Sequence, residues 1–344
     1  MRIGLVKPPI AGHRLRGSGI YYEKLCQHLA GYRDIDLFTG SWSDVRGKAD
    51  VYHFAYFDLF FLTLPFKLPA RSIITVHDVI PLKFPKHFPV GFTGKLKLTL
   101  EKIILNQAEV VVTDSESSKS DIANLLKINR QKIEVVYLAA GDNFSKKKTG
   151  EEIAKVLNQY KLPDKFFLYV GDGNWNKNLP NIIQATLRTK VNLVLVGPPL
   201  KEKPVSHPWT ASLNQSYELI QGRSNIFSLR NVTETDLSCL YAGAQALIFP
   251  SYYEGFGLPV VEAFASGCPV ITSHQGSLAE IAGEVALFVD PDNVDKIIEA
   301  IKKVNKSFNL RNKLRQLGLK QAARFSWKKT AEQTAAVYKQ VYDL

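Results

Sequence analysis

Two carboxylates, Glu254 and Glu262, stand eight positions apart, with a glycine-rich turn between them. The apolar run 246–250 before them is typical of a buried strand, and the segment 258–266 is predicted to be a helix with Pro259 in its first turn, where a missing N–H is harmless. A strand, a glycine turn and a helix N-terminus form an anion site, because the helix end offers N–H groups and a partial positive charge. The residues expected around the anion are Gly255, Phe256, Gly257 and Leu258.

Glu262 lies about one helical turn into this helix, so its carboxylate can point back toward the same site. An ionised carboxylate is a hydrogen-bond acceptor with several lone pairs and therefore suits hydroxyl groups. The pair of glutamates thus predicts a ligand that carries phosphate with hydroxyls beside it.

A second anion site is predicted after the apolar run 166–170, where the sequence continues Gly-Asp-Gly-Asn-Trp-Asn-Lys-Asn-Leu-Pro. A strand, a glycine turn and a helix start recur here, and Lys177 supplies a point charge for a diphosphate. The alternative is an ordinary lysine in solvent.

His77 and Asp78 follow the buried run 72–76. In an open α/β sheet the carboxyl ends of the strands border the ligand crevice, so His77 is a candidate to hydrogen-bond a sugar hydroxyl or to polarise the reacting groups. A structural histidine is the alternative. No cluster of histidine, cysteine or aspartate has metal-ligand spacing, so we expect no metal site. The glycines at 17 and 19 do not complete a dinucleotide fingerprint.

Short β-rich runs alternate with helical patterns along the chain, which favours parallel sheets covered on both faces. The pattern restarts after the lysine-rich stretch 143–150, so we predict two domains with a linker at about 142–165. The predicted strands are 2–6, 35–38, 51–54, 72–76, 110–113, 134–137, 166–170, 191–196, 246–249, 270–272 and 287–289.

The composition is that of a folded protein with an anion-seeking surface. The chain has 344 residues, 45% of them hydrophobic, and a formal net charge of +12. Three widely spaced cysteines favour a reducing compartment, and neither a secretory signal nor a membrane-spanning run is recognisable. No nucleic-acid motif accompanies the positive charge, so nucleotide diphosphates and anionic lipid surfaces are the expected partners.

The runs 250–273 and 276–291 closely resemble the signature of the retaining, nucleotide-sugar-dependent glycosyltransferases of family 4, also called glycosyl transferases group 1. The resemblance covers some forty positions. It implies the GT-B fold: two Rossmann-like, doubly wound parallel-sheet domains that face each other across a cleft. It places an acceptor-side domain at 1–155, a donor-binding domain at 156–326 and a C-terminal helix at 327–344 that crosses back to the first domain.

The resemblance also assigns roles to residues. By analogy, Glu254 contacts the donor sugar and Glu262 the ribose hydroxyls, while His77 belongs to an "HD" element whose histidine approaches the transferred sugar. Gly19 lies in a loop that approaches the donor phosphates, and the backbone of Val232 contacts the base.

In the family the lysine matched by Lys177 is commonly accompanied by an arginine in the preceding loop. Here Asp172, Asn174 and Asn176 occupy that loop. Arg14 and Arg16 are further candidates for anion contact. The catalytic set expected from the sequence is His77, Glu254 and Lys177.

The resemblance implies transfer of a hexose to an acceptor hydroxyl on a glycan or a lipid-linked sugar. The sequences of residues 77–81 and 276–283 resemble those of the mannosyltransferase branch. GDP-mannose is therefore the first expected donor and a UDP-sugar the second. No further cofactor is expected. Acceptor recognition is expected around 56–66 and 84–94, where aromatic residues and lysines mix, although these aromatics fit a core equally well.

The protein is expected in the cytoplasm, with peripheral contact at the anionic inner face of a membrane left open. Two other functions also stay open: a nucleotide-sugar epimerase of the same fold, and a non-catalytic protein of this fold that binds a nucleotide sugar or a lipid.

Overall fold

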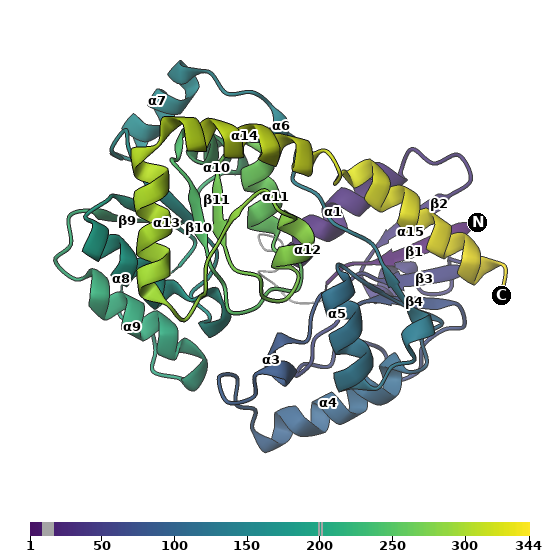
Figure 1. Ribbon diagram of the computed structural model, residues 1–344. Coiled ribbons are helices and arrows are strands. Elements are labelled where there is room, and N and C mark those ends of the chain that lie inside the picture. The colour runs from purple at the N-terminus through teal and green to yellow at the C-terminus, as the bar shows by residue number, and fades with distance from the viewer. Residues whose placement is uncertain (9–16, 199, 201) are drawn as a thin grey trace. The chain divides into compact units, whose positions relative to one another are not determined.

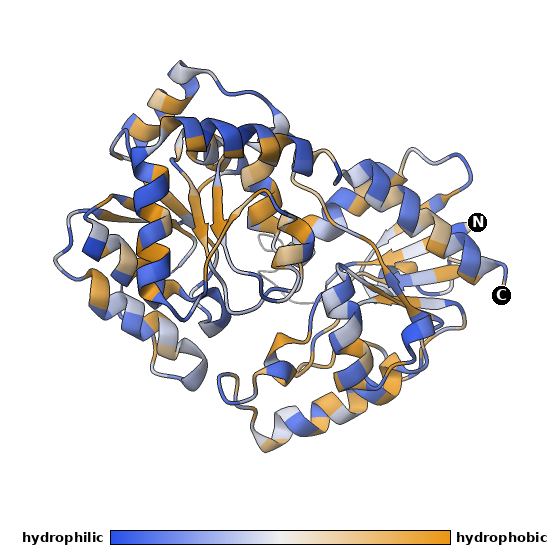
Figure 2. Cartoon of the chain, viewed as in Figure 1, coloured by the Kyte–Doolittle hydropathy of each residue, from blue (hydrophilic) through white to orange (hydrophobic). Residues whose placement is uncertain are grey.

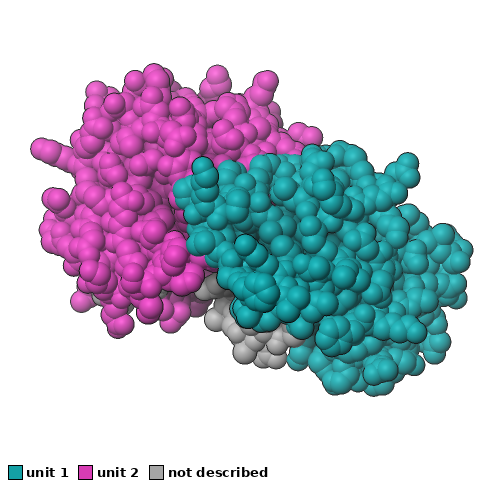
Figure 3. Space-filling model, turned by 90° about the horizontal axis from the view of Figure 1, so that it is seen from below, with its two compact units in different colours: residues 1–138, 326–344 teal, residues 139–325 magenta. Residues whose placement is uncertain are grey.

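The chain folds into two compact units, seen in the computed structural model of Figure 1 and coloured separately in Figure 3. Unit 1 contains residues 1–138 and 326–344, and unit 2 contains residues 139–325. The structure describes residues 1–8, 17–198, 200 and 202–344. The sequence-predicted anion contacts Arg14 and Arg16 lie outside the described residues.

Unit 1 is built on a six-stranded parallel sheet in the order β2-β1-β3-β4-β5-β6. Its strands are β1 (Arg2–Val6), β2 (Asp36–Gly40), β3 (Val51–Phe54), β4 (Ser72–Thr75), β5 (Val110–Thr113) and β6 (Ile133–Val135). Its helices are α1 (Gly17–Leu29), α2 (Trp42–Val45), α3 (Ile80–Lys83), α4 (Phe92–Leu105), α5 (Glu116–Asp121) and α15 (Trp327–Tyr342), with a π-helical turn at Ile122–Leu126.

Unit 2 is built on a second six-stranded parallel sheet in the order β12-β11-β10-β7-β8-β9. Its strands are β7 (Phe167–Val170), β8 (Leu193–Val196), β9 (Ile226–Leu229), β10 (Leu247–Phe249), β11 (Val270–Thr272) and β12 (Leu287–Phe288). Its helices are α6 (Asp142–Ser145), α7 (Gly150–Gln159), α8 (Leu179–Thr189), α9 (Ala211–Ile220), α10 (Glu234–Gly243), α11 (Leu258–Ala265), α12 (Leu278–Ala282), α13 (Val294–Lys306) and α14 (Phe308–Ala322).

Hydrophobic strands form the core of each unit. Every residue of β3, β4, β5, β8, β10 and β11 is buried, as expected for parallel strands covered on both faces. Figure 2 shows these strands in the hydrophobic colour, while α13 and α14 carry many hydrophilic residues. The predicted α/β class with two parallel sheets is confirmed.

The sequence analysis missed β9. All four of its residues are only half-buried, because β9 is an edge strand that pairs with β8 alone. Its sequence, Ile-Phe-Ser-Leu, places a serine where a central strand would carry an apolar residue. A short run of three apolar residues and one serine, without clear alternation, is a weak strand signal.

The last helix of the chain, α15, is tied into unit 1 by buried polar contacts. Ser326 caps it by accepting a hydrogen bond from the N–H of Lys329, as the sequence predicts. The Tyr338 hydroxyl lies 2.8 Å from His53 Nδ1, and His53 Nε2 lies 2.7 Å from the Thr75 hydroxyl. Burial lowers the pKa of His53 to about 3, so this histidine is neutral and serves as a hydrogen-bonding link. Among the described residues, no helix is both long and apolar enough to cross a membrane.

Candidate active site

The order of the strands in unit 2 brings two functional loops together. Strands β7 and β10 are parallel neighbours at the point where the strand order reverses direction. The loop after β7 carries Lys177, and the loop after β10 carries Glu254. In open α/β sheets, ligands bind outside the carboxyl ends of the strands at such a switch point. The topology therefore places both predicted residues where a ligand site belongs.

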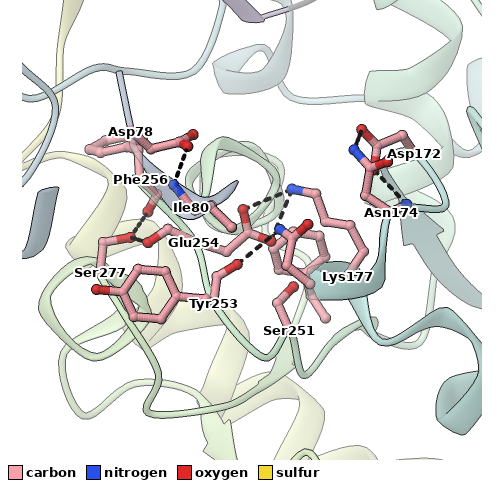
Figure 4. Close-up of polar contacts among 12 residues, drawn as sticks. Asp78, Ile80, Asp172, Asn174, Lys177, Ser251, Tyr253, Glu254, Phe256 and Ser277 are labelled. Carbon is pink, nitrogen blue, oxygen red and sulfur yellow. Dashed lines mark hydrogen bonds and ion pairs between the residues drawn. The ribbon is translucent and has the colours of Figure 1, made fainter. Parts of the chain in front are cut away.

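Lys177 and Glu254 form a close ion pair. The ammonium Nζ lies 2.9 Å from Glu254 Oε1 and 2.7 Å from Oε2, as Figure 4 shows. The side chains are only 17% and 6% exposed, so the contact is largely removed from water. Lys177 Nζ also lies 5.3 Å from the centre of the Phe249 ring. The sequence predicted both residues but not that they would pair.

The ion pair offsets much of the cost of burying Glu254. Burial raises the pKa of the Glu254 carboxyl and the Lys177 ammonium lowers it, with the net pKa above its ordinary value. A buried ion pair adds little net stability, because desolvation of the two charges cancels most of their attraction. Removing one partner is costly, since the other charge is then left buried alone.

Asparagine side chains hold the two loops against each other. The Asn176 side chain donates to the carbonyl of Tyr253 at 3.0 Å, and the N–H of Tyr252 donates to the carbonyl of Asn176 at 2.7 Å. The side chain of Asn178 donates to the carbonyl of Pro250 at 3.0 Å. These contacts fix the register of the loops that carry Lys177 and Glu254.

A third loop, after β11, fixes the backbone on both sides of Glu254. The Ser277 hydroxyl donates to the carbonyl of Glu254 at 3.1 Å and to that of Phe256 at 2.8 Å (Figure 4). Gly276, at φ +60°, approaches so closely that a Cβ would lie 2.5 Å from the Glu254 carbonyl oxygen. Gly257, at φ +93°, begins α11, and Pro259 occupies its first turn as predicted. Gly255 and Leu258 flank Phe256 and Gly257 in the segment that the sequence predicts as an anion site.

Glu262 lies inside α11 and is buried. The hydroxyl of Tyr241, on α10, donates to its Oε2 at 2.9 Å. Burial raises the pKa of Glu262 to about 8 despite this hydrogen bond. The sequence analysis treats Glu262 as an ionised acceptor, whereas burial favours the neutral carboxyl near neutral pH. Tyr241 was missed, because no local pattern relates α10 to α11.

The loop that lacks the family's arginine is closed by its own polar side chains. Asp172 accepts hydrogen bonds from the backbone N–H of Asn174 at 3.1 Å and from its side-chain amide at 2.8 Å (Figure 4). Asp172 and Asn174 are therefore occupied with each other. Lys177 is the cation that the described residues of this loop place against Glu254.

His77, in unit 1, is paired with a carboxylate that the sequence analysis did not identify. Its Nδ1 lies 2.7 Å from Oδ2 of Asp114, which follows the neighbouring strand β5. Burial lowers the pKa of His77, but the Asp114 carboxylate more than compensates, so the pKa lies above its ordinary value. Asp78 accepts a hydrogen bond from the N–H of Ile80, the first residue of α3, at 3.0 Å (Figure 4).

The remaining predicted residues are placed as follows. Gly19 lies in the first turn of α1 in unit 1 and is buried. Val232 lies in unit 2 between β9 and α10 and is half-buried. No contact of either residue identifies a ligand. Within the described parts of the chain, no group of three or more histidines, cysteines or acidic residues is arranged to hold a metal ion.

Comparison with known proteins decides the family. Residues 151–321 match the model described as glycosyl transferases group 1, and residues 13–139 match that of glycosyltransferase family 4. The chain is 30% identical to O-antigen chain mannosyltransferase B of Escherichia coli, over 90% of this chain and 80% of that protein. The chain belongs to glycosyltransferase family 4. It is therefore a glycosyltransferase, as the sequence predicts.

One further relative agrees with this assignment, and one solved structure shares the fold. O-antigen chain mannosyltransferase RfbU of Salmonella typhimurium is 30% identical over 70% of this chain and 62% of its own length. The solved structure of HepE from Anabaena in complex with UDP superposes with a TM-score of 0.73 at 16% identity, covering 99% of this chain and 100% of that one. The GT-B fold class predicted for this family 4 member is thus confirmed.

We predict that Gly276→Ala damages the site beyond its effect on stability. Alanine at positive φ costs about 1 kcal/mol, and here its Cβ would also push the backbone of Glu254. Gly222→Ala is the matched control, because Gly222 has φ +68° and open space around it. Both variants should lose stability in urea unfolding, Gly276→Ala the more because of its contact with the Glu254 backbone, and only Gly276→Ala should also lose donor turnover. Equal turnover in the two variants would contradict the close approach.

We also predict a pH dependence that originates at Glu262. Folding raises the pKa of this carboxyl from 4.5 to about 8, so the folded chain holds a proton that the unfolded chain has released. Its stabilising contribution is complete below pH 4.5 and is lost as pH rises through about 8.

Glu262→Gln should therefore flatten the dependence of the unfolding free energy on pH across this window, as measured by urea denaturation at several pH values. Each pKa unit corresponds to about 1.4 kcal/mol. The exposed Glu284→Gln serves as the control and should leave the profile unchanged. An unchanged profile for Glu262→Gln would show that the carboxyl is ionised in the folded protein.

Proposed function

We propose that this chain transfers mannose, with retention of configuration, from GDP-mannose to a hydroxyl of a glycan or a lipid-linked sugar. The observation that carries the proposal is the Lys177–Glu254 ion pair at the switch point of unit 2. The choice of mannose is supported by the two mannosyltransferase relatives named above. A UDP-sugar is the second candidate donor, since HepE was solved with UDP.

The chemical demand of the reaction is the negative charge that develops on the leaving nucleoside diphosphate. In our proposal, Lys177 and the N-terminus of α11 around Gly255–Leu258 stabilise that charge. Glu254 holds the ammonium in place and accepts a hydrogen bond from a hydroxyl of the transferred sugar. These groups are preorganised by the hydrogen bonds between the loops, so little rearrangement is needed when charge develops.

Glu262 is proposed to bind the ribose hydroxyls. A neutral carboxyl can both donate a hydrogen bond to a hydroxyl oxygen and accept one from it. The Tyr241 hydroxyl on one carboxyl oxygen fixes the orientation of the group. The proposed base contact at Val232 and phosphate contact at Gly19 complete the donor assignment.

His77 is proposed to contact the transferred sugar through Nε2, because Asp114 engages Nδ1. Nε2 is buried and has no hydrogen-bond partner among the residues that the structure describes. Asp114 is then a positioning residue that fixes the orientation of the ring and holds the proton on Nδ1. Peripheral contact with an anionic membrane, where a lipid-linked acceptor would be met, is the final part of the proposal.

The first test replaces the ion pair. Lys177→Met and Glu254→Gln should each lower the turnover of GDP-mannose with octyl α-mannoside as the probe acceptor by about a hundredfold or more, because each change removes charge stabilisation at the leaving group or leaves a buried charge unpaired. Released nucleotide is measured. Lys165→Met, at an exposed lysine of the same unit, is the control.

Glu262→Ala should instead weaken the binding of GDP, measured by calorimetry, more than it lowers turnover. The same assays with UDP-glucose in place of GDP-mannose decide the donor. Normal transfer by the Lys177→Met and Glu254→Gln variants would exclude the site. Donor binding without nucleotide release on addition of any acceptor would favour a non-catalytic protein.

The second test concerns Asp114. Asp114→Asn removes the charge that raises the pKa of His77, so the limb of the pH–rate profile that His77 controls should move to lower pH. In a His77→Gln background the same substitution should no longer shift the profile, and this double variant separates positioning from a general effect on folding. An identical shift in both backgrounds would contradict the pairing.

A further inference from the structure

Helix α4 of unit 1 presents apolar side chains to solvent. Phe92, Leu96 and Ile103 are 84%, 55% and 59% exposed. Spacings of four and seven residues place these three side chains on one face of the helix. The opposite face is the packed one, where Glu101 and Ile104 are buried. Figure 2 shows hydrophobic residues recurring along the whole helix.

The loop between β3 and β4 extends this apolar face. Phe61 and Phe66 are 58% and 73% exposed. The loop is fastened to α4, because the backbone N–H of Thr63 donates to Glu101 and the ammonium of Lys97 lies 5.3 Å from the centre of the Phe61 ring. Its far end is fastened too, since Gln107 accepts from the N–H of Leu68 at 3.2 Å. The α4 surface is defined by five residues: Phe61, Phe66, Phe92, Leu96 and Ile103.

Basic residues accompany this surface, and acidic ones are scarce. Residues 58–103 contain seven lysines and arginines and three acids, Asp58, Asp78 and Glu101. Asp58 is half-buried and accepts from the N–H of Phe61 at 3.0 Å. Glu101 is buried under the loop, and Asp78 is half-buried beside α3. Lys67 and Lys95 are exposed. Lys67 directly follows Phe66, and Lys95 directly precedes Leu96. The basic residues are Lys67, Arg71, Lys83, Lys86, Lys95, Lys97 and Lys102.

Apolar side chains with lysines around them match the interface of an anionic bilayer. Aromatic and aliphatic side chains enter the boundary between headgroups and acyl chains, while lysines extend to the anionic headgroups. A second copy of this chain fits less well, because a symmetric contact would bring the same lysines face to face. Scattered exposed apolar residues need no explanation, but five on one helix and its attached loop do.

We propose that the α4 surface docks the enzyme onto an anionic phospholipid membrane, with α4 lying along the surface. The inference rests on the membrane contact proposed above and names the residues that make it. Part of the region expected to recognise the acceptor lies on this surface, so docking would bring a lipid-linked acceptor to unit 1.

The test measures binding of the full chain to vesicles of phosphatidylcholine with or without phosphatidylglycerol, by co-sedimentation. The wild-type protein should bind the anionic vesicles and be released by salt. The double variant Leu96→Ser/Ile103→Ser should weaken this binding roughly tenfold or more, because it removes apolar area that would enter the membrane. The double variant Lys67→Gln/Lys95→Gln should weaken it by a similar factor, because it removes attraction to the anionic headgroups.

Matched controls come from unit 2. Val205→Ser/Phe308→Ser changes two exposed apolar residues, and Lys302→Gln/Lys303→Gln changes two exposed lysines. Neither pair should alter vesicle binding. Calorimetric binding of GDP serves as a separate readout that all four variants should retain, so a failure of membrane docking is distinguishable from a failure of the donor site.

Three results would overturn the proposal. The first is a wild-type protein that does not bind anionic vesicles. The second is equal binding by the α4 variants and their controls. The third is loss of self-association, measured by sedimentation velocity, in Leu96→Ser/Ile103→Ser without any change in vesicle binding, because that result would assign the surface to a second copy of the chain.

Discussion

The contact between Lys177 and Glu254 is the constraint on which the loops at the switch point of unit 2 depend. Two opposite charges taken largely out of water contribute little net stability, so the rest of the loop structure has to keep them paired. The side chains of Asn176, Asn178 and Ser277 do so by binding backbone carbonyls of the loop that carries Glu254 or of the residues next to it. The site is rigid because neutral hydrogen bonds, which do add stability, surround a charged pair that does not.

In unit 1, too, polar groups from different elements hold each other in place. His77 is oriented by Asp114, and neutral His53 links the hydroxyls of Tyr338 and Thr75 inside the core. In each unit a titratable group is held by a partner from a different element. Such pairs shift pKa values away from their ordinary range, which is the condition for acid–base or electrostatic roles near neutral pH.

Much of the secondary structure and of the local geometry around Glu254 was predictable from the sequence. The strand, glycine turn and helix start around Glu254 follow from local preferences, and so does the helix cap at Ser326. Apolar runs of four or five residues gave most strands to within a residue or two. The half-buried edge strand β9 was not predicted, because its short run with one serine lacks the pattern that marks a strand. The aromatics around 56–66 divided between core and surface: Phe57 is buried, while Phe61 is exposed.

The sequence by itself determined the residue types of the site, the turns that hold them and, through one long matching segment, the family. Tertiary structure alone decided the pairings: Lys177 with Glu254, Glu262 with Tyr241, and His77 with Asp114. The reason is physical. Turns and caps depend on neighbours within a few residues, whereas these pairs join positions from 21 to 77 residues apart and exist only because parallel strands and packed helices bring their ends together. The exposed face of α4 is of the same kind, because this helix carries apolar residues on more than one face and its sequence does not say which face the fold buries.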